Sequence, residues 1–388
     1  MKKRRVLVAT VILLLAVGSV SYVLVRGRGI PTRPLSTRPT TTRPTTAPPT
    51  TAPPTTTLPS SSVPTAVTST TAPGAVPTGV ALGIDTPPGN DLQVVSQIGR
   101  VPAVLDGFFG WSQIDGAPDP FPRSFVDAVT SMGSTPMITW TPGRSWNSET
   151  GAGGPPVPAA ISGPPPYGLA GIVAGSFDPY IERWAEAARN DGRTVYVRLM
   201  HEMNIGVFPW GAGVNGNAPI EYVEAFRHVV DVFKRVGAKN VQFVWCVATS
   251  VGSDRAPIAD YFPGDDYVSW VAMDGYNRSS VDPRRFPQIF GADYAEVTSL
   301  SRRPVMVAET ATVDSPTQPS MKANWIEDSF LNMVPKEFPR IKAILYFDSS
   351  LTRFSYPIDT SPEALAAIRT VFANSYYQAS APPTTLSY

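Results

Sequence analysis

Cysteine and histidine are nearly absent from this 388-residue chain, which holds one cysteine, Cys246, and two histidines, His201 and His228. A single cysteine excludes an intrachain disulfide, and it also excludes cysteine-rich zinc sites. His201 and Glu202 begin like the His-Glu-x-x-His motif of zinc metalloproteases, but Ile205 occupies the place of the second histidine. The sequence also has no Gly-x-Ser-x-Gly elbow, no phosphate-binding loop and no dinucleotide-binding glycine pattern.

Charge is sparse and balanced. Charged residues make up 16% of the chain, compared with about 25% in typical globular domains. The formal net charge is +1, and no run of lysine or arginine occurs beyond the N-terminus. We therefore predict no nucleic-acid partner, because such binding relies on a field of positive charge.

Long apolar runs are confined to the N-terminus. Lys2–Arg5 precede an uncharged, mostly apolar run, Val6–Val25, and Arg26 and Arg28 follow directly. About 20 apolar residues suffice to cross a bilayer as a helix, whereas the apolar region of a signal peptide is about 7–15 residues. We expect residues 1–28 to be an uncleaved signal anchor in the bacterial cell membrane, with the remainder outside the cytoplasm. A cleaved signal peptide, and hence secretion, is the alternative.

Residues 29–77 contain no aspartate or glutamate and consist mostly of threonine, proline, serine and alanine. Such a chain cannot bury enough apolar surface to fold, so we predict a disordered, extended linker. A short tail at 379–388 is also predicted to be disordered. The segment between them, 78–378, is predicted to be a single domain.

This domain alternates short apolar runs with amphipathic segments. Eight runs read as strands buried on both faces: Val80–Asp85, Ala103–Gly107, Pro136–Trp140, Thr194–Met200, Val241–Cys246, Trp270–Asp274, Val305–Ala308 and Ala343–Phe347. Helices are predicted at Asp178–Asn190, Ile220–Val236, Ser320–Val334 and Pro362–Asn374, and the helix signal is weaker after the first and fifth strands. Eight such repeats predict a (β/α)8 TIM barrel.

The fourth predicted strand leads into a cluster of polar side chains. Arg198, His201, Glu202 and Asn204 lie within seven residues, and functional residues of a TIM barrel follow the ends of its strands. A charge inside a buried strand is costly unless it is paired, so Arg198 requires an acidic partner. An ordinary internal salt bridge remains the alternative for Arg198.

A second carboxylate, Glu309, ends the seventh predicted strand, and Tyr276 follows the sixth. Glu202 and Glu309 together suggest glycoside hydrolysis, which needs two carboxyl groups, about 5–5.5 Å apart in retaining enzymes. The charge of Arg198 would favour the ionised form of a neighbouring nucleophile. Tyr276 is a candidate to donate to that nucleophile or to the sugar, or simply to anchor a loop.

Aromatic residues are frequent near the predicted strand ends, and sugar-binding clefts use such rings as platforms. We expect about half of them to be core residues. The candidates for substrate binding are Trp140, Trp210, Trp245 and Phe347.

These segments resemble glycoside hydrolase family 26, the β-mannanase family of the retaining barrel clan. The resemblance rests on Arg198-Leu-Met-His-Glu-Met-Asn204, Phe208-Pro-Trp210, Tyr261-Phe-Pro-Gly-Asp-Asp-Tyr-Val-Ser-Trp270, Asp274-Gly-Tyr276 and Pro304-Val-Met-Val-Ala-Glu309. It implies that Glu202 is the acid/base and Glu309 the nucleophile. It further implies that His201 and Arg198 orient this pair, that Tyr276 contacts the nucleophile, and that Trp210 and Trp245 line the cleft.

The chain departs from the family where sugar platforms are expected. The family commonly places Gly-x-Trp after His-Glu-Met-Asn, whereas this chain has Ile205-Gly-Val207. Cys246-Val-Ala248 replaces the frequent Ser-x-Asn, and Phe347 stands where the clan usually has tryptophan. The catalytic chemistry is therefore better supported than mannan specificity.

The sequence predicts a monomeric retaining glycoside hydrolase, most similar to an endo-β-1,4-mannanase, that acts on a polysaccharide or oligosaccharide. The chemistry needs no metal or organic cofactor. Two alternatives remain: hydrolysis of another β-glycan, such as mixed-linkage glucan or envelope polysaccharide, and a catalytically silent carbohydrate-binding barrel.

Overall fold

The computed structural model describes residues 79–86, 91–113, 117–144, 167–249, 256–349 and 354–378. Their strands are β1 (Val80–Asp85), β2 (Val104–Ser112), β3 (Thr135–Arg144), β4 (Val195–Leu199), β5 (Val241–Ala248), β6 (Trp270–Asn277), β7 (Val305–Thr312), β8 (Ile341–Phe347) and β9 (Tyr377–Gln378). The eight predicted strands are thus all present, and several extend beyond the predicted carboxyl end.

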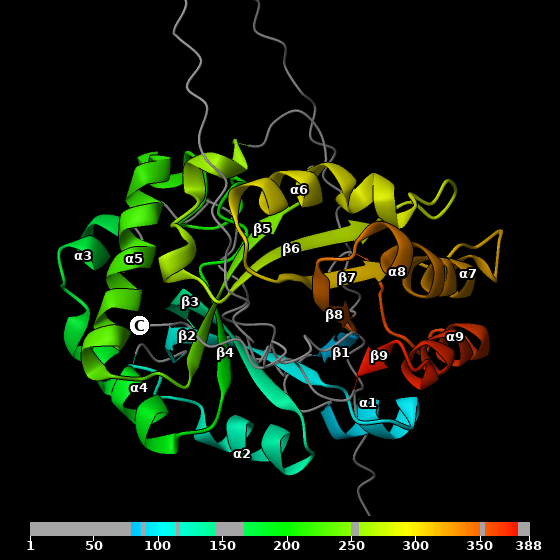
Figure 1. Cartoon of the computed structure of the whole chain (residues 1–388), viewed down its shortest axis with the longest axis horizontal. Helices are drawn as coiled ribbons and strands as arrows, with labels where there is room; N and C mark the ends of the chain where they lie inside the picture. Colours follow the sequence, from blue (N-terminus) through cyan, green and yellow to red (C-terminus); the bar gives the residue numbers. More distant parts are fainter. Residues whose placement is uncertain are drawn as a thin grey trace, which may run out of the picture. The chain divides into compact units, whose positions relative to one another are not determined.

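The strands form a closed parallel barrel. They pair in the order β2 to β8 and then β1, and β1 also pairs with β2 (Figure 1). This confirms the predicted (β/α)8 architecture. The short strand β9 pairs with Val80 and Ala81 at the start of β1, and the backbone N–H of Val80 donates to the carbonyl of Tyr376 at 3.1 Å.

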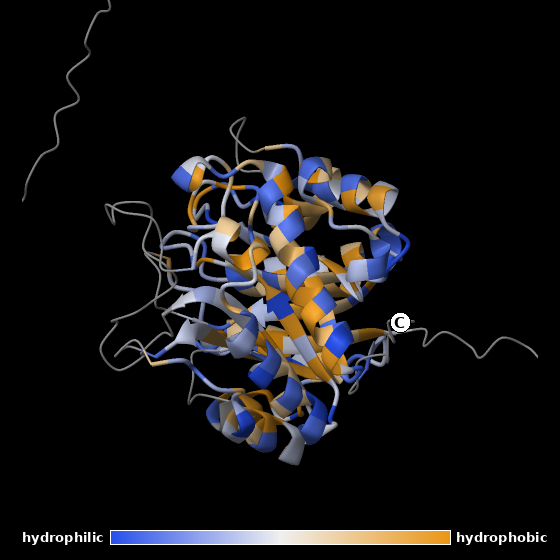
Figure 2. Cartoon of the chain, turned by 90° about the vertical axis from the view of Figure 1, so that its left-hand side faces the viewer, coloured by the Kyte–Doolittle hydropathy of each residue, from blue (hydrophilic) through white to orange (hydrophobic). Residues whose placement is uncertain are grey.

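Helices surround the barrel: α1 (Asp91–Ile98), α2 (Arg123–Ser131), α3 (Leu169–Val173), α4 (Asp178–Asp191), α5 (Pro219–Val236), α6 (Phe286–Leu300), α7 (Met321–Glu327), α8 (Val334–Glu337) and α9 (Pro362–Ala373). Figure 2 shows apolar strands inside and helices that alternate between polar and apolar residues, as an outer ring with one buried face requires. The helix predicted at Ser320–Val334 is divided, because a π-helical turn, Asp328–Met333, joins α7 to α8. Between β5 and β6, the described residues form 3₁₀ turns at Ile258–Tyr261 and Asp265–Tyr267.

Alternate strand residues point into the barrel. The inward apolar layer consists of small and large side chains: Ala81, Ala103, Val104, Met137, Tyr196, Val244, Cys246, Trp270, Ala272, Met306, Ala308, Ala343 and Leu345. A larger apolar cluster fills the space between strands and helices. Two residues beyond the inward layer, the same parity brings Asp106, Thr139, Arg198 and Asp274 to the carboxyl end of the barrel. The apolar layer is therefore the floor beneath a polar mouth.

Within the described ranges, no helix combines the length and hydropathy needed to cross a membrane. The predicted membrane segment at 1–28, the linker at 29–77 and the tail at 379–388 lie outside these ranges.

Candidate active site

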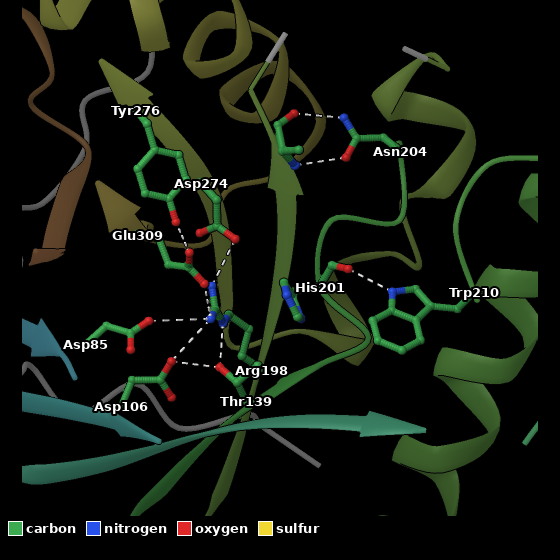
Figure 3. A network of polar contacts seen from close by, with 11 residues as sticks. Asp85, Asp106, Thr139, Arg198, His201, Asn204, Trp210, Asp274, Tyr276 and Glu309 are labelled. Carbon is green, nitrogen blue, oxygen red and sulfur yellow. Dashed lines mark hydrogen bonds and ion pairs between the residues drawn. The ribbon is translucent and has the colours of Figure 1, made fainter. Parts of the chain in front are cut away.

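Arg198 lies at the centre of the polar mouth and has no exposed surface. Its Nε donates to the hydroxyl of Thr139 at 2.8 Å, and Nη1 donates to Asp274 at 2.9 Å (Figure 3). Nη2 donates to Glu309 at 2.5 Å. The expectation that Arg198 has an acidic partner is therefore confirmed, and one of its partners is the carboxylate at the end of the seventh strand.

Two further carboxyl groups, Asp85 and Asp106, face Arg198 and were not singled out from the sequence. Asp106 accepts from Arg198 at 3.2 Å and from the hydroxyl of Thr139 at 2.7 Å, and Asp85 lies 3.9 Å from the guanidinium. Burial raises the pKa of Asp106 to about 7, although Arg198 acts to lower it. Burial also raises the pKa of Asp85 well above its usual value. One guanidinium thus faces several carboxyl groups, and burial disfavours the charged form of both Asp85 and Asp106.

A β-bulge in β7 directs Glu309 into the mouth. Met273 of β6 pairs with Val307, but the next residue, Asp274, pairs with Glu309, so Ala308 is an extra residue. Ala308 faces the barrel interior, so without this insertion strand alternation would point the next residue, Glu309, away from the interior. The bulge brings Glu309 next to Arg198, and the hydroxyl of Tyr276 donates to the other oxygen of Glu309. Both oxygens of Glu309 are therefore held.

Glu202 reaches the mouth through a strained turn after β4. Met200 and Glu202 have φ angles of +45° and +54°, in the left-handed region that residues other than glycine seldom adopt. The backbone remains attached to both neighbouring strands, because the N–H of Met200 donates to Trp140 and that of Glu202 donates to Cys246. Such strain persists where surrounding contacts fix it, and it is common at active sites. It positions the Glu202 carboxyl in the cavity described below.

The electrostatic surroundings of Glu202 differ from those of Glu309. Burial is the main cause that raises the pKa of Glu202 to about 7, and the nearby Glu309 raises it further. Arg198 and Arg278 act in the opposite direction. A carboxyl group that holds its proton near neutral pH is suited to act as a general acid.

His201 lines the cavity described below and packs among aromatic rings. Its ring contacts Phe208 at a centroid distance of 4.6 Å and Phe108 at 6.0 Å. Burial and the charge of Arg198 keep its pKa well below the usual value, so the imidazole is neutral. Trp210 donates its indole N–H to the carbonyl of His201 at 2.7 Å and stacks on Phe208.

Asn204 fixes the loop that carries Glu202. Its side-chain amide donates to the carbonyl of Ala248, and its side-chain oxygen accepts from the N–H of Ala248, both at 2.8 Å. The residue is fully buried. Asn204 thereby attaches the loop after β4 to the end of β5, and it positions Glu202 from outside the cavity.

The mouth opens into a cavity of about 330 Å³. Ten residues line it: Phe108, His201, Glu202, Phe208, Tyr276, Arg278, Glu309, Phe347, Phe354 and Tyr356. The predicted residues Glu202, Glu309, His201, Tyr276 and Phe347 thus meet in one place, with Arg198 directly beneath. A cavity lined by aromatic rings around two carboxyl groups fits a sugar ring.

The sequence of residues 83–316 matches the model of the family described as glycosyl hydrolase family 26. That match covers more than half of the chain. The chain belongs to glycosyl hydrolase family 26. The family relationship was expected from the motifs around Glu202 and Glu309, and it is confirmed.

Curated relatives of this family 26 chain carry the names of different glycanases. It is 30% identical over 279 residues to endoglucanase H of Acetivibrio thermocellus, and the aligned region covers 70% of this chain and 27% of that protein. It is 28% identical over 159 residues to mannan endo-1,4-β-mannosidase A and B of Caldalkalibacillus mannanilyticus, and the aligned region covers 39% of this chain and 27% of that protein. The matches thus span about a quarter of the length of each relative.

Solved structures share the fold. A double mutant of Cellulomonas fimi endo-β-1,4-mannanase superimposes with a TM-score of 0.57 and 20% identity, over 77% of this chain and 72% of that one. At this identity the likeness establishes the barrel architecture alone.

The family 26 barrel places Trp140, Trp245 and Trp210 away from the cavity wall, which differs from the expected positions of these residues. Trp140 and Trp245 are fully buried. Strand alternation turns both outward, because Trp245 lies between the inward-facing Val244 and Cys246, and Trp140 follows Thr139, which contacts Arg198. Trp140 stacks on Trp184, and Trp245 packs against Phe262. Trp210 is not among the residues that line the cavity, and it contacts His201 through the hydrogen bond from its indole N–H.

Proposed function

We propose that this chain is a retaining glycoside hydrolase that cleaves internal β-1,4 bonds of a polysaccharide in the manner of a β-mannanase. The observation that supports it is the pairing of two unlike carboxyl groups in one cavity. Glu202 has a pKa of about 7, whereas Glu309 is held at both oxygens by Arg198 and Tyr276. Carboxyl groups in such contrasting environments divide into acid and nucleophile.

The proposed reaction has two steps. In the first, Glu309 attacks the anomeric carbon while Glu202 gives its proton to the leaving glycosidic oxygen, so the C–O bond breaks and a glycosyl-enzyme ester forms. In the second, Glu202 takes a proton from water, and the resulting hydroxide attacks the same carbon and releases Glu309. Two inversions retain the β configuration.

Two observations bear on the substrate class. The names of the relatives include an endoglucanase and a mannan endo-1,4-β-mannosidase, so β-1,4-linked glycans are the first substrates to test. The cavity wall, however, is built from phenylalanine and tyrosine and contains no tryptophan among its lining residues. This difference in platforms favours a second candidate within the same chemistry, a β-glycan other than mannan.

The test is hydrolysis of a polysaccharide panel by Glu309→Ala, Glu202→Gln and the parent protein. We expect Glu202→Gln to lower kcat/KM by about 10²–10⁴-fold, the usual contribution of general acid catalysis, and Glu309→Ala to lower it at least as much. Glu186→Gln, on the exposed face of α4, is the matched control. NMR of the first product should show the β anomer. Full activity in either catalytic variant, or an initial α anomer, refutes the proposal.

A further inference from the structure

Arg278 gives the cavity a positive charge that the proposed hydrolysis does not use. It follows the end of β6, its side chain is exposed, and it lines the same cavity as Glu202 and Glu309. The other arginine of the site, Arg198, is buried beneath the cavity and is occupied by carboxyl groups. Among the described residues that line this cavity, Arg278 is therefore the cationic side chain that a ligand can reach.

Two aromatic rings hold the guanidinium of Arg278. Its central carbon lies 4.9 Å from the ring centre of Tyr276 and 5.7 Å from that of Phe354. Tyr276 is fixed in turn by Tyr356, whose ring stacks on it at 5.1 Å. Contact between the face of a guanidinium and aromatic rings leaves the N–H donors at its edge available. The rings thus contact the face of the guanidinium and leave the donors at its edge available to a ligand.

Those donors have no protein acceptor among the residues that the structure describes. Other arginines of the described residues are engaged: Arg193 pairs with Asp127 and Asp191, and the guanidinium of Arg340 donates to backbone carbonyls. The positive charge of Arg278 also lowers the pKa of Glu202, which opposes the protonation that a general acid needs. A charge that works against the acid indicates another role for Arg278.

We propose that Arg278 binds an anionic group, a carboxylate carried by the glycan, and that the substrate of this enzyme is an acidic β-glycan. A planar guanidinium presents two parallel N–H donors that match the two oxygens of a carboxylate. The carboxylate belongs to a uronic acid or to an acidic substituent, since both present the same two oxygens. This inference rests on the proposed function, because it names the substrate class of the same cavity.

The experiment compares matched neutral and acidic glycans in an inactive background. Full-length Glu309→Gln protein is titrated with oligosaccharides of konjac glucomannan and with the same oligosaccharides oxidised to carboxylates at C6. We expect the oxidised form to bind about fivefold more tightly at low salt, the scale of a partly exposed ion pair, with the preference declining as salt is added. Glu202→Gln serves as a second inactive background if Glu309→Gln folds poorly.

Variants of Arg278 test whether this side chain causes the preference. Adding Arg278→Gln should abolish it, whereas Arg278→Lys, which keeps the charge without the planar pair of donors, should retain part of it. Arg302→Gln is the control, because it removes an exposed charge just before β7, at the opposite end of the barrel. Arg302→Gln should leave the preference unchanged.

Equal affinity for the two forms, no measurable binding of the oxidised form, or a preference that survives Arg278→Gln would each overturn the inference. Since binding is measured without turnover, these outcomes are independent of the hydrolysis test. A parent protein that hydrolyses neutral glucomannan and shows no charge preference keeps the proposed function and loses the acidic substrate. A charge preference without hydrolysis of any glycan keeps the anion-binding role of Arg278 and refutes the proposed function.

Discussion

A single residue, Arg198, connects the stability of the barrel to its chemistry. It contacts Asp106 and Asp274, whose side chains are closed to solvent, and also Glu309, which lines the cavity. Removal of one partner from a buried ion pair typically costs about 3–5 kcal/mol, because the remaining charge is left uncompensated. The network is therefore intolerant of single substitutions, and the position of Glu309 depends on groups that never touch substrate.

The pKa of Glu202 sets the pH dependence that we expect. Its carboxyl must be protonated to act as the acid in the first step, and its pKa is about 7. The value of kcat/KM should therefore fall as the pH rises above about 7. In Arg278→Gln, loss of the positive charge should raise the pKa of Glu202 and move this limb to higher pH. A pH–rate profile measures both effects, and a limb that moves to lower pH in the variant contradicts the assignment.

At the scale of elements, strand positions were predictable because strands buried on both faces have a continuous apolar signal. β1, β5, β6 and β7 begin at the predicted residues. The predicted carboxyl ends of β6 and β7 were too short, because polar residues of the site interrupt that signal, whereas β5 extends through two more apolar residues, Val247 and Ala248. The turn after β4 and the bulge at Ala308 leave no comparable pattern in the sequence.

Asp85 and Asp106 are site residues that the sequence could have predicted. Asp85 and Asp106 lie within predicted strands, at positions of the same parity as the inward layer. The argument that Arg198 needs acidic partners applied equally to them, since a buried carboxylate also needs a partner. The same parity would have turned Trp140 and Trp245 outward. What the sequence lacked was the register that brings Asp85, Asp106 and Arg198 together.

The link between the loop after β4 and β5 gives a prediction at this scale. Asn204→Ala removes two hydrogen bonds and leaves the N–H and C=O of Ala248 without partners. We expect a loss of about 1–3 kcal/mol in the free energy of unfolding, together with a fall in kcat larger than any change in KM. Chemical denaturation and steady-state kinetics measure the two effects. Asn217→Ala, in the same connection between β4 and α5, is the control, and equal kinetic effects in both variants would count against the role of Asn204.

For the whole molecule, buried carboxyl groups govern how stability depends on pH. Asp85, Asp106, Asp274 and Asp348 all have pKa values raised mainly by burial. A group whose pKa is higher in the folded state binds its proton more tightly there, so its contribution is greatest at low pH and is lost as the pH rises through the folded value. We therefore expect the barrel to become less stable between about pH 4 and pH 7.

Asp348 offers the cleanest test, because it lies outside the Arg198 network. Its pKa is about 6, and it accepts a hydrogen bond from the N–H of Ile358 that asparagine can also accept. Asp348→Asn should remove up to about 3 kcal/mol of the decline in the free energy of unfolding between pH 4 and pH 7. Urea denaturation at both pH values measures the decline, with exposed Asp282→Asn as the control. A decline equal to that of the parent protein rules out Asp348 as a cause.

The pairing of β9 with the first residues of β1 has a consequence for how the molecule is handled. It brings the first and the last residues of the described barrel together at the end opposite the cavity, where the backbone N–H of Val80 donates to the carbonyl of Tyr376. A tag or a solid support attached next to Val80 or next to Gln378 would therefore be attached at this same face. Immobilised through either end, the barrel would hold its cavity outward, so a polymer too large to diffuse into a matrix could still be cut at its surface.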